Sequence, residues 1–229
     1  MCPALAAPAV GIDVAYCPCV ATMSFLFVDQ AGSTVQLEAL GDAGASPIRD
    51  ELFQILRAAV DDHEGTVVDH TGDGVMASFT GATDALGCAV DIQREVHRHW
   101  ASRAAEHAVR VRIGLHTGET VVNAEGREFG MAVVIAARLC AAARSGQVLI
   151  SDITQALTAG AEAARFRRLE PLALKGVADP VGVAEVEWDP PNVQDGWWPL
   201  PAALAASAQF GFVGRSPELE ALRVAWARA

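Results

Sequence analysis

The sequence has no apolar run that approaches the roughly 18 residues a membrane-spanning helix requires. Positive charge is also scarce, because 17 lysines and arginines face 28 aspartates and glutamates and leave a net charge of -11. This balance argues against a surface that binds nucleic acid directly and against association with anionic membranes. The apolar-rich beginning lacks a basic leading region, so no signal peptide is expected and the predicted location is cytoplasmic.

Cysteine is too sparse to form a scaffold. The five cysteines are an odd number and give no disulfide framework. Cys17 and Cys19 have no second pair that would complete a metal or redox site, and we interpret them as tail thiols. Cys88 and Cys140 lie in alanine-rich stretches and are expected to be buried as small hydrophobic residues. With 52% hydrophobic residues, the chain is predicted to fold as one domain with tails.

Strand-like and helix-like patterns alternate along the chain, which predicts a mixed α/β (α+β) fold. Strands are predicted at 24–29, 65–70, 75–79, 109–116, 119–123, 147–151, 165–173 and 181–188. Helices are predicted at 34–40, 47–63, 83–100 and 131–143. A turn is expected at Thr117-Gly118, and the last two strands are expected to form an edge hairpin around Lys175-Gly176.

Two short segments carry the residues that indicate chemistry. In the first, an apolar run delivers Asp29 to the end of a predicted strand, and a small, hydroxyl-rich turn at 31–34 opens a helix. The second places Asp73 between Gly72 and Gly74, where a tight hairpin would hold it rigidly. Two carboxylates and the exposed N–H groups of a helix start are what a divalent cation and a triphosphate require.

Taken together, these segments resemble the class III nucleotidyl cyclases, the adenylyl and guanylyl cyclases, and the resemblance covers residues 23–188. It implies a ferredoxin-like βαββαβ core with helices packed on an antiparallel-rich sheet. It also implies the reaction of this family, in which the 3′-hydroxyl of a nucleoside triphosphate attacks the α-phosphate and pyrophosphate leaves. The implied cofactors are two divalent cations, Mg²⁺ or Mn²⁺, about 4 Å apart.

The resemblance assigns roles to particular residues. Asp29 and Asp73 match the metal carboxylates, and Gln30 would offer its backbone carbonyl to a metal. Arg138 matches the arginine that stabilises charge on the α-phosphate across a dimer interface, so a homodimer with two sites is implied. The apolar neighbours of Arg138 argue against an ordinary solvated helix arginine. The amides expected to face the β- and γ-phosphates are those of Ala31, Gly32, Ser33 and Thr34.

Three positions depart from the adenylyl cyclase pattern. Asp69 stands where a purine-reading lysine is expected, and Arg127 where an acidic residue is expected, unless a shift of the loop places Glu125 or Glu128 there. Val134 replaces the asparagine that positions the ribose. Because valine cannot hydrogen-bond, the ribose would be poorly placed, at a cost on the order of 10²-fold in rate.

The reversed charges at the base-reading positions favour GTP. Guanine offers donors at N1 and N2 and acceptors at O6 and N7, which suit Asp69 and Arg127 respectively. ATP remains an alternative, and a direct Asp69–Arg127 pair would leave the pocket without base preference. At the level of the whole domain, two hypotheses stand: a slow cyclase, or a degenerate cyclase-fold regulatory module that binds nucleotide, metal or a partner protein.

The ends of the chain differ in composition from the domain. Residues 1–22 are expected to form a flexible tail, and residues 189–210 a proline-rich linker. Residues 211–229 resemble the opening of the ATPase module that follows cyclase-like domains in some large bacterial transcriptional regulators, although no phosphate-binding loop follows. They predict a truncated start of such a module and an ATPase or transcription-regulator partner chain; an incidental amphipathic helix is the alternative.

Overall fold

The computed structural model describes residues 19–101, 103, 107–122, 128–160 and 165–188 of the chain. Arg127, residues 1–18, the predicted linker at 189–210 and the segment at 211–229 lie outside these described residues.

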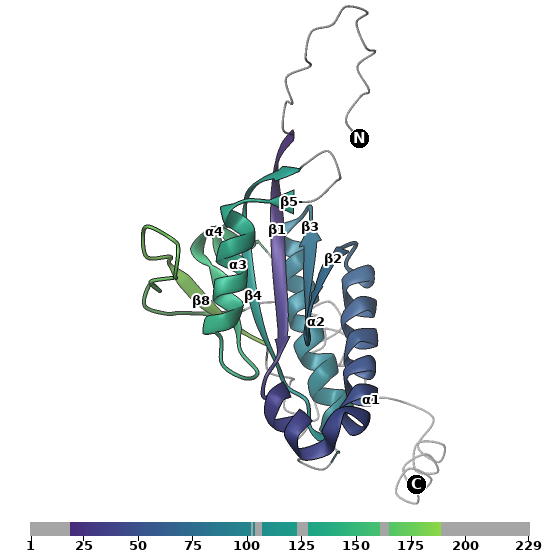
Figure 1. Ribbon diagram of the computed structural model, residues 1–229. Helices are drawn as coiled ribbons and strands as arrows, with labels where there is room; N and C mark the ends of the chain where they lie inside the picture. Colours follow the sequence, from purple (N-terminus) through teal and green to yellow (C-terminus); the bar gives the residue numbers. More distant parts are fainter. Residues whose placement is uncertain (1–18, 102, 104–106, 123–127, 161–164, 189–229) are drawn as a thin grey trace, which may run out of the picture. The chain divides into compact units, whose positions relative to one another are not determined.

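One sheet of eight strands runs through the described domain (Figure 1). The main path has the order β2 (Thr66–Thr71), β3 (Gly74–Phe79), β1 (Cys19–Gln30), β4 (Val111–Val122), β6 (Val148–Ser151), β8 (Val183–Glu187) and β7 (Arg165–Arg168). The short β5 (Glu128–Phe129) pairs with the end of β4. Among the described strands only β4 and β6 pair in parallel, so the predicted antiparallel-rich sheet and fold class are confirmed.

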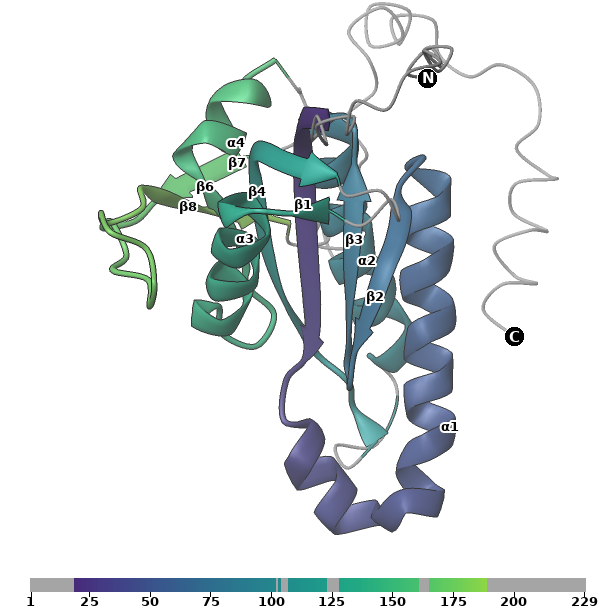
Figure 2. The same ribbon diagram turned by 45° about the horizontal axis from the view of Figure 1, so that its top comes forward.

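Helices cover both faces of this sheet (Figures 1 and 2). α1 (Ser33–Asp62) and α2 (Ala82–Trp100) pack against each other on one face, and α3 (Met131–Ala142) packs on the other. A short helix, α4 (Asp152–Leu157), follows β6 directly. The two faces therefore have separate apolar clusters.

The largest core lies between the sheet and α1 and α2, and α3 contributes to two smaller clusters. Fully buried side chains of the largest core include Leu26, Leu52, Leu56, Phe79, Ile92 and Ile113. One smaller cluster consists of Phe25, Met76, Ala132 and Ala136, and the other of Leu139, Ala143, Leu149, Leu174 and Val183. α3 comes close to β4 because Gly114 has no side chain: a Cβ there would lie 2.1 Å from the backbone nitrogen of Cys140. Small residues thus set the position of α3 over the sheet.

α1 consists of two helical segments, as predicted, and they meet at Gly41. The backbone of Gly41 is not helical, with φ of 67° and ψ of 170°. Such a left-handed φ is accessible to glycine without steric cost. The second segment begins before Pro47, earlier than predicted, so that Pro47 lies inside the helix, where it cannot donate a backbone hydrogen bond.

The predicted turn at Thr117-Gly118 is wrong. β4 continues through both residues, and it pairs with β1 from Val111 to Val122 without interruption. Full-length pairing with a long neighbour outweighs the local preference of glycine for turns. For the same reason β1 begins at Cys19, ahead of the predicted domain start at residue 23.

α4 is absent from the predicted elements. Ser151 caps it by accepting a hydrogen bond from the N–H of Thr154 at 3.3 Å. This helix has only six residues, too few to show an apolar repeat in the sequence, although a serine before an aspartate is a typical helix start. The predicted edge hairpin is confirmed, since β7 and β8 pair antiparallel.

Cys88 and Cys140 are free and buried, as predicted. Burial is the largest cause that raises the pKa of each thiol, to about 12, so both remain protonated and unreactive at neutral pH. Among the described helices none combines the length and apolar character needed to cross a membrane.

Candidate functional site

The register of β1 brings the two predicted metal carboxylates together. Asp29, near the end of β1, is paired with Gly74 of β3 on one side and with Arg112 of β4 on the other. Asp73 directly precedes Gly74 in a tight turn, in which Gly72 has a φ of 70°. Glycine adopts this left-handed conformation easily. The predicted hairpin is confirmed, and the carboxyl group of Asp73 lies close enough to interact with that of Asp29.

An ion pair holds the carboxylate of Asp29. Nη2 of Arg112 lies 2.5 Å from Oδ2 of Asp29, and Nε of Arg112 donates to the same oxygen at 2.7 Å. Partial burial nevertheless raises the pKa of Asp29 above its ordinary value. Arg112 opposes this shift, whereas the charge of Asp73 and its hydrogen bond add to it. Arg112 alone therefore does not compensate the negative charge of the two carboxylates, and a bound cation would stabilise their ionised forms.

A pocket of about 230 Å³ opens beside the turn between β2 and β3. It is lined by Gln30, Ser33, Thr34, Gln36, Leu37, Ala45, Arg49 and Asp73. The first hydrogen bond within α1 runs from the N–H of Gln36 to the carbonyl of Gly32, at 3.1 Å, so the amides of Ser33 and Thr34 precede it. These helix-start donors and the guanidinium of Arg49 make a setting suited to phosphate oxygens.

Ala31 departs from its predicted role. Its N–H donates to the carbonyl of Arg110 at 2.9 Å, which ties the β1–α1 turn to the start of β4. That donor is engaged within the chain and does not face the phosphates as predicted. Gln30 is buried, and its side-chain amide donates to Gln36 at 2.7 Å. The turn is thus fixed from both sides, with Gly32 in a left-handed conformation at φ 77°.

Arg138 lies on an exposed face of α3 that is otherwise apolar. Met131, Val134 and Arg138 follow one another at helical spacing and are all exposed, Met131 at 53% and Val134 at 38%. The sequence-based argument against an exposed Arg138 is wrong for the single chain. Exposed apolar side chains on one stripe beside an arginine are typical of a surface that contacts another molecule.

Of the two predicted base-reading residues, the structure describes Asp69 but not Arg127. Asp69 is exposed on β2, after a register shift that follows Val67, and it is paired with Met76. Its Oδ1 accepts a hydrogen bond from the N–H of His70 at 2.8 Å. Met76 packs against the residues under α3, so Asp69 belongs to the same face of the sheet as the α3 cluster. Arg127 lies outside the described residues.

The donor set fits a cation that is shared with a substrate. No group of three or more histidine, cysteine, aspartate or glutamate side chains gathers within the part of the chain that the structure describes. A site with only two carboxylates still suits Mg²⁺ or Mn²⁺, because such ions are commonly held by one or two carboxylates together with substrate phosphates. Asp29 and Asp73, next to the phosphate-suited pocket, meet that requirement.

Sequence reasoning missed two arginines of the site. Arg112 belongs to an alternating strand, and only the register of β1 against β4 reveals that it faces Asp29. Arg49 lies in the second segment of α1, and the bend at Gly41 returns it to the pocket formed by the first segment. Neither relation leaves a signal in local sequence patterns.

We expect Asp29→Asn to raise the melting temperature at neutral pH. A carboxyl group whose folded-state pKa is raised costs folding free energy when ionised, and that cost vanishes as the pH falls through this pKa. The variant should therefore melt above the wild type at pH 7, by a margin that shrinks toward about pH 4. Circular dichroism melts across this range test it, with Asp179→Asn at an exposed position as the control. A lower melting temperature for Asp29→Asn at pH 7 would show that the ion pair with Arg112 outweighs burial.

Comparison with known proteins identifies the family. The family model of the adenylate and guanylate cyclase catalytic domain matches residues 17–185. An uncharacterised protein of Mycobacterium tuberculosis is 34% identical over 152 residues, which make up 66% of this chain and 50% of that protein. The structure is similar to that of the adenylyl cyclase CyaB from P. aeruginosa, with a TM-score of 0.67, 22% identity, and coverage of 76% of this chain and 97% of that one.

A second solved structure is the adenylate/guanylate cyclase/hydrolase from Silicibacter pomeroyi. It has a TM-score of 0.63 and 29% identity, and the match covers 73% of this chain and 96% of that chain. The chain spans about half the length of the first curated relatives that it matches. The matched region contains Asp29, Asp73 and Arg138. This chain belongs to the family of adenylate and guanylate cyclase catalytic domains.

Proposed function

We propose that the domain converts a nucleoside triphosphate into a 3′,5′-cyclic nucleotide and pyrophosphate, slowly, with two divalent cations at a homodimer interface. One observation carries this proposal: the carboxyl groups of Asp29 and Asp73 interact at the edge of a pocket that the start of α1 and Arg49 make suitable for phosphates. A domain with only a scaffolding role has no use for a second carboxylate placed where it raises the pKa of Asp29.

Each residue of the site has a task that follows from its position. Asp29 and Asp73 would hold the cations, which supply positive charge to the phosphates and favour ionisation of the attacking hydroxyl. The amides of Ser33 and Thr34 and the guanidinium of Arg49 would bind the terminal phosphates. Arg112 neutralises Asp29 in the free protein, and its guanidinium would add positive charge next to Asp29 when the cations are bound.

Arg138 would serve the site of a second copy. It is exposed on α3 beside the uncovered side chains of Met131 and Val134, so its guanidinium is free to cross an interface. A two-fold dimer in which α3 of one subunit covers the Asp29 side of the other creates two equivalent sites. The arginine would then stabilise charge that develops on the α-phosphate, where a positioned donor acts mainly on the transition state.

Formation of cyclic nucleotide tests the proposal directly. The full chain is incubated with Mn²⁺ and either ATP or GTP, and the cyclic product is quantified by mass spectrometry. We expect product with at least one of the two nucleotides and none after addition of a chelator. Tight binding of Mn²⁺ and nucleotide without any product would instead support the second candidate.

The second candidate is a cyclase-fold module that binds nucleotide without turnover. Val134 supports it, because an exposed valine stands where the resemblance implies the ribose-positioning asparagine. The exposed stripe on α3 serves this candidate equally, as a surface for a regulatory partner. The two candidates share the metal site and differ in the alignment of the ribose, so a single substitution separates them.

We expect Val134→Asn to raise kcat by about 10-fold or more while KM changes less. An amide at this position would orient the ribose for in-line attack, and the gain is realised mainly near the transition state. Val134→Ala, which shortens the side chain without adding an amide, is the matched control and should leave kcat near the wild-type value. Identical kinetics for the asparagine and alanine variants would show that this position does not contact the ribose.

We also expect GTP to be preferred over ATP. Asp69 is exposed on the α3 face, and among the described residues it accepts a hydrogen bond from its neighbouring amide alone, so its carboxylate would be able to accept from the N1 and N2 donors of guanine. Asp69→Ala should lower the affinity for GTP by roughly 10-fold, in line with the loss of a hydrogen bond to a charged group. Binding of both nucleotides to wild type and variant is measured side by side with Mn²⁺. A preference for ATP that survives Asp69→Ala contradicts the base-reading role.

A further inference from the structure

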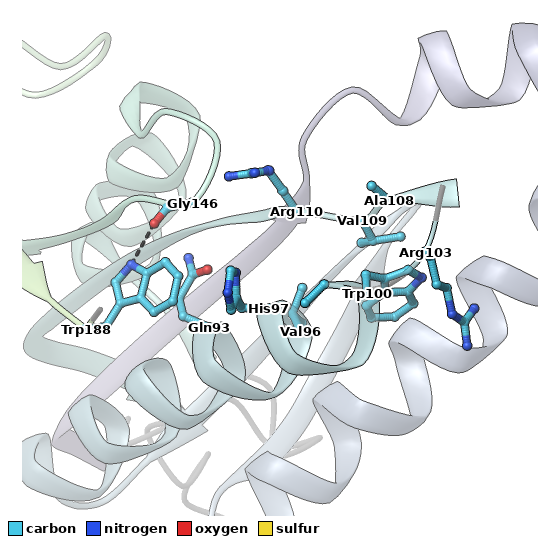
Figure 3. Close-up of a pocket in the computed structure, with 11 residues that line it drawn as sticks. Gln93, Val96, His97, Trp100, Arg103, Ala108, Val109, Arg110, Gly146 and Trp188 are labelled. Carbon is cyan, nitrogen blue, oxygen red and sulfur yellow. Dashed lines mark hydrogen bonds between the residues drawn. The ribbon is translucent and has the colours of Figure 1, made fainter. Parts of the chain in front are cut away.

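A second pocket, apart from the phosphate-suited one, lies where α2 ends and β4 begins. Its volume is about 340 Å³, which is within the range of small-molecule sites. Side chains that line it include Gln93, His97, Trp100, Arg103, Arg110 and Trp188. Figure 3 shows the two tryptophans at opposite ends of the pocket, with Gln93 and His97 between them and Arg110 above.

The two indole rings are fixed, and one of them has an unused donor. Nε1 of Trp188 donates to the carbonyl of Gly146 at 2.7 Å (Figure 3), and the ring centroids of Trp188 and His97 are 6.2 Å apart. Trp100 is 97% buried, yet its Nε1 has no hydrogen-bond partner within the described residues. Buried donors are nearly always paired, so a ligand with an acceptor would complete this site.

The charge of the pocket is positive in a strongly acidic chain. Arg103 lies over the ring of Trp100, 5.6 Å from its centroid, and is neutralised by Glu51 at 2.8 Å. Arg110 is exposed and makes no ion pair with any described residue. None of the described residues that line the pocket carries a carboxylate, although the chain has a net charge of -11. An arginine without an ion-pair partner, beside aromatic rings, favours a planar anion.

We propose that this pocket binds a small aromatic carboxylate. The ring system would lie among Trp100, His97 and Trp188, the carboxylate would pair with Arg110, and a polar group at the other end would accept from the indole N–H of Trp100. Aromatic contacts with His97 and the tryptophans supply the apolar part of the binding free energy, and Arg110 selects the charge.

The pocket is mechanically connected to the site of the carboxylates. The carbonyl of Arg110 accepts from the N–H of Ala31 in the β1–α1 turn, at 2.9 Å. Val111, the first residue of β4, accepts a hydrogen bond at its carbonyl from the side-chain amide of Gln93 at 3.1 Å. Arg112, the residue after it, forms the ion pair with Asp29. A ligand that pairs with Arg110 would therefore shift the position of the β1–α1 turn, which leads into the phosphate-suited pocket. This regulatory part rests on the proposed function and implies a reciprocal change in nucleotide affinity.

The test uses 6-hydroxy-2-naphthoate as the probe, with the full chain labelled at the indole nitrogens with ¹⁵N. We expect the Trp100 N–H resonance, assigned by Trp100→Phe, to move on addition of the probe as the donor gains an acceptor. Calorimetry should give roughly 10-fold weaker binding for Arg110→Gln than for wild type, as expected for loss of a charged hydrogen bond. Arg165→Gln, at an exposed arginine on β7, is the matched control and should bind as wild type.

Three results would overturn the proposal: equal affinity in Arg110→Gln and wild type, binding of the neutral 6-hydroxy-2-naphthamide as tight as that of the acid, or a Trp100 resonance that the probe does not move. Because binding is read without turnover, these outcomes are independent of whether the domain is a cyclase. Nucleotide affinity measured with and without the probe tests the coupling separately, and an unchanged affinity refutes only that regulatory part.

Discussion

Replacement of Asp73 by alanine should abolish metal-dependent nucleotide binding as well as cyclase activity. Asp29 and Asp73 share one cluster of negative charge, and only these two side chains are placed to hold a cation beside the phosphate-suited pocket among the described residues. Loss of an outer hydrogen-bond partner of a metal ligand already costs about 10–100-fold in affinity. Loss of one of two carboxylate ligands should therefore weaken binding by more than about 100-fold.

Calorimetry with Mn²⁺ and 3′-deoxy-GTP measures this binding without turnover, because the analogue lacks the attacking hydroxyl. Asp179→Ala, which removes an exposed carboxylate away from the site, should bind as wild type and controls for the change in net charge. Equal affinity in Asp73→Ala and wild type would refute the metal role of both carboxylates, since the argument depends on their sharing the ion.

Features that depend on neighbouring residues in the sequence were predictable. The apolar run before Asp29 and the glycines around Asp73 specify a strand end and a tight hairpin by local chemistry alone. The two segments of α1 and the buried Cys88 follow from periodicity in the same way. These elements place the carboxylates, which is why the family and the core of the site were visible in the sequence.

Features that depend on register were not predictable. The ion pair between Asp29 and Arg112 requires the pairing of β1 with β4, and the bond from Ala31 to Arg110 requires the same alignment. The continuation of β4 through Gly118 follows from this pairing too, because a complete ladder of hydrogen bonds outweighs the preference of one glycine. Local patterns do not encode which residues of distant strands face each other.

The exchange of subunits between two inactive variants should restore activity. Arg138→Ala removes one positioned donor to the transition state and should lower kcat by roughly 10²–10³-fold. Asp73→Ala should be inactive for lack of metal. In a mixed dimer, however, one site combines Asp73 from the Arg138→Ala subunit with Arg138 from the Asp73→Ala subunit, and is therefore intact. Half of randomly exchanged dimers are mixed and each has one intact site of two, so about a quarter of wild-type activity should return.

The matched control combines both substitutions in one chain. When this double variant is mixed with Asp73→Ala, no dimer contains an intact site, so no recovery is expected even though the protein concentration and the number of altered residues are similar. Recovery in the first mixture alone places Arg138 across the interface, on the face of α3 where Met131 and Val134 are exposed. Absence of recovery, with mixed dimers confirmed by native mass spectrometry, would mean that Arg138 acts within its own subunit or not at all. The exposed stripe on α3 would then have to be assigned to a different partner.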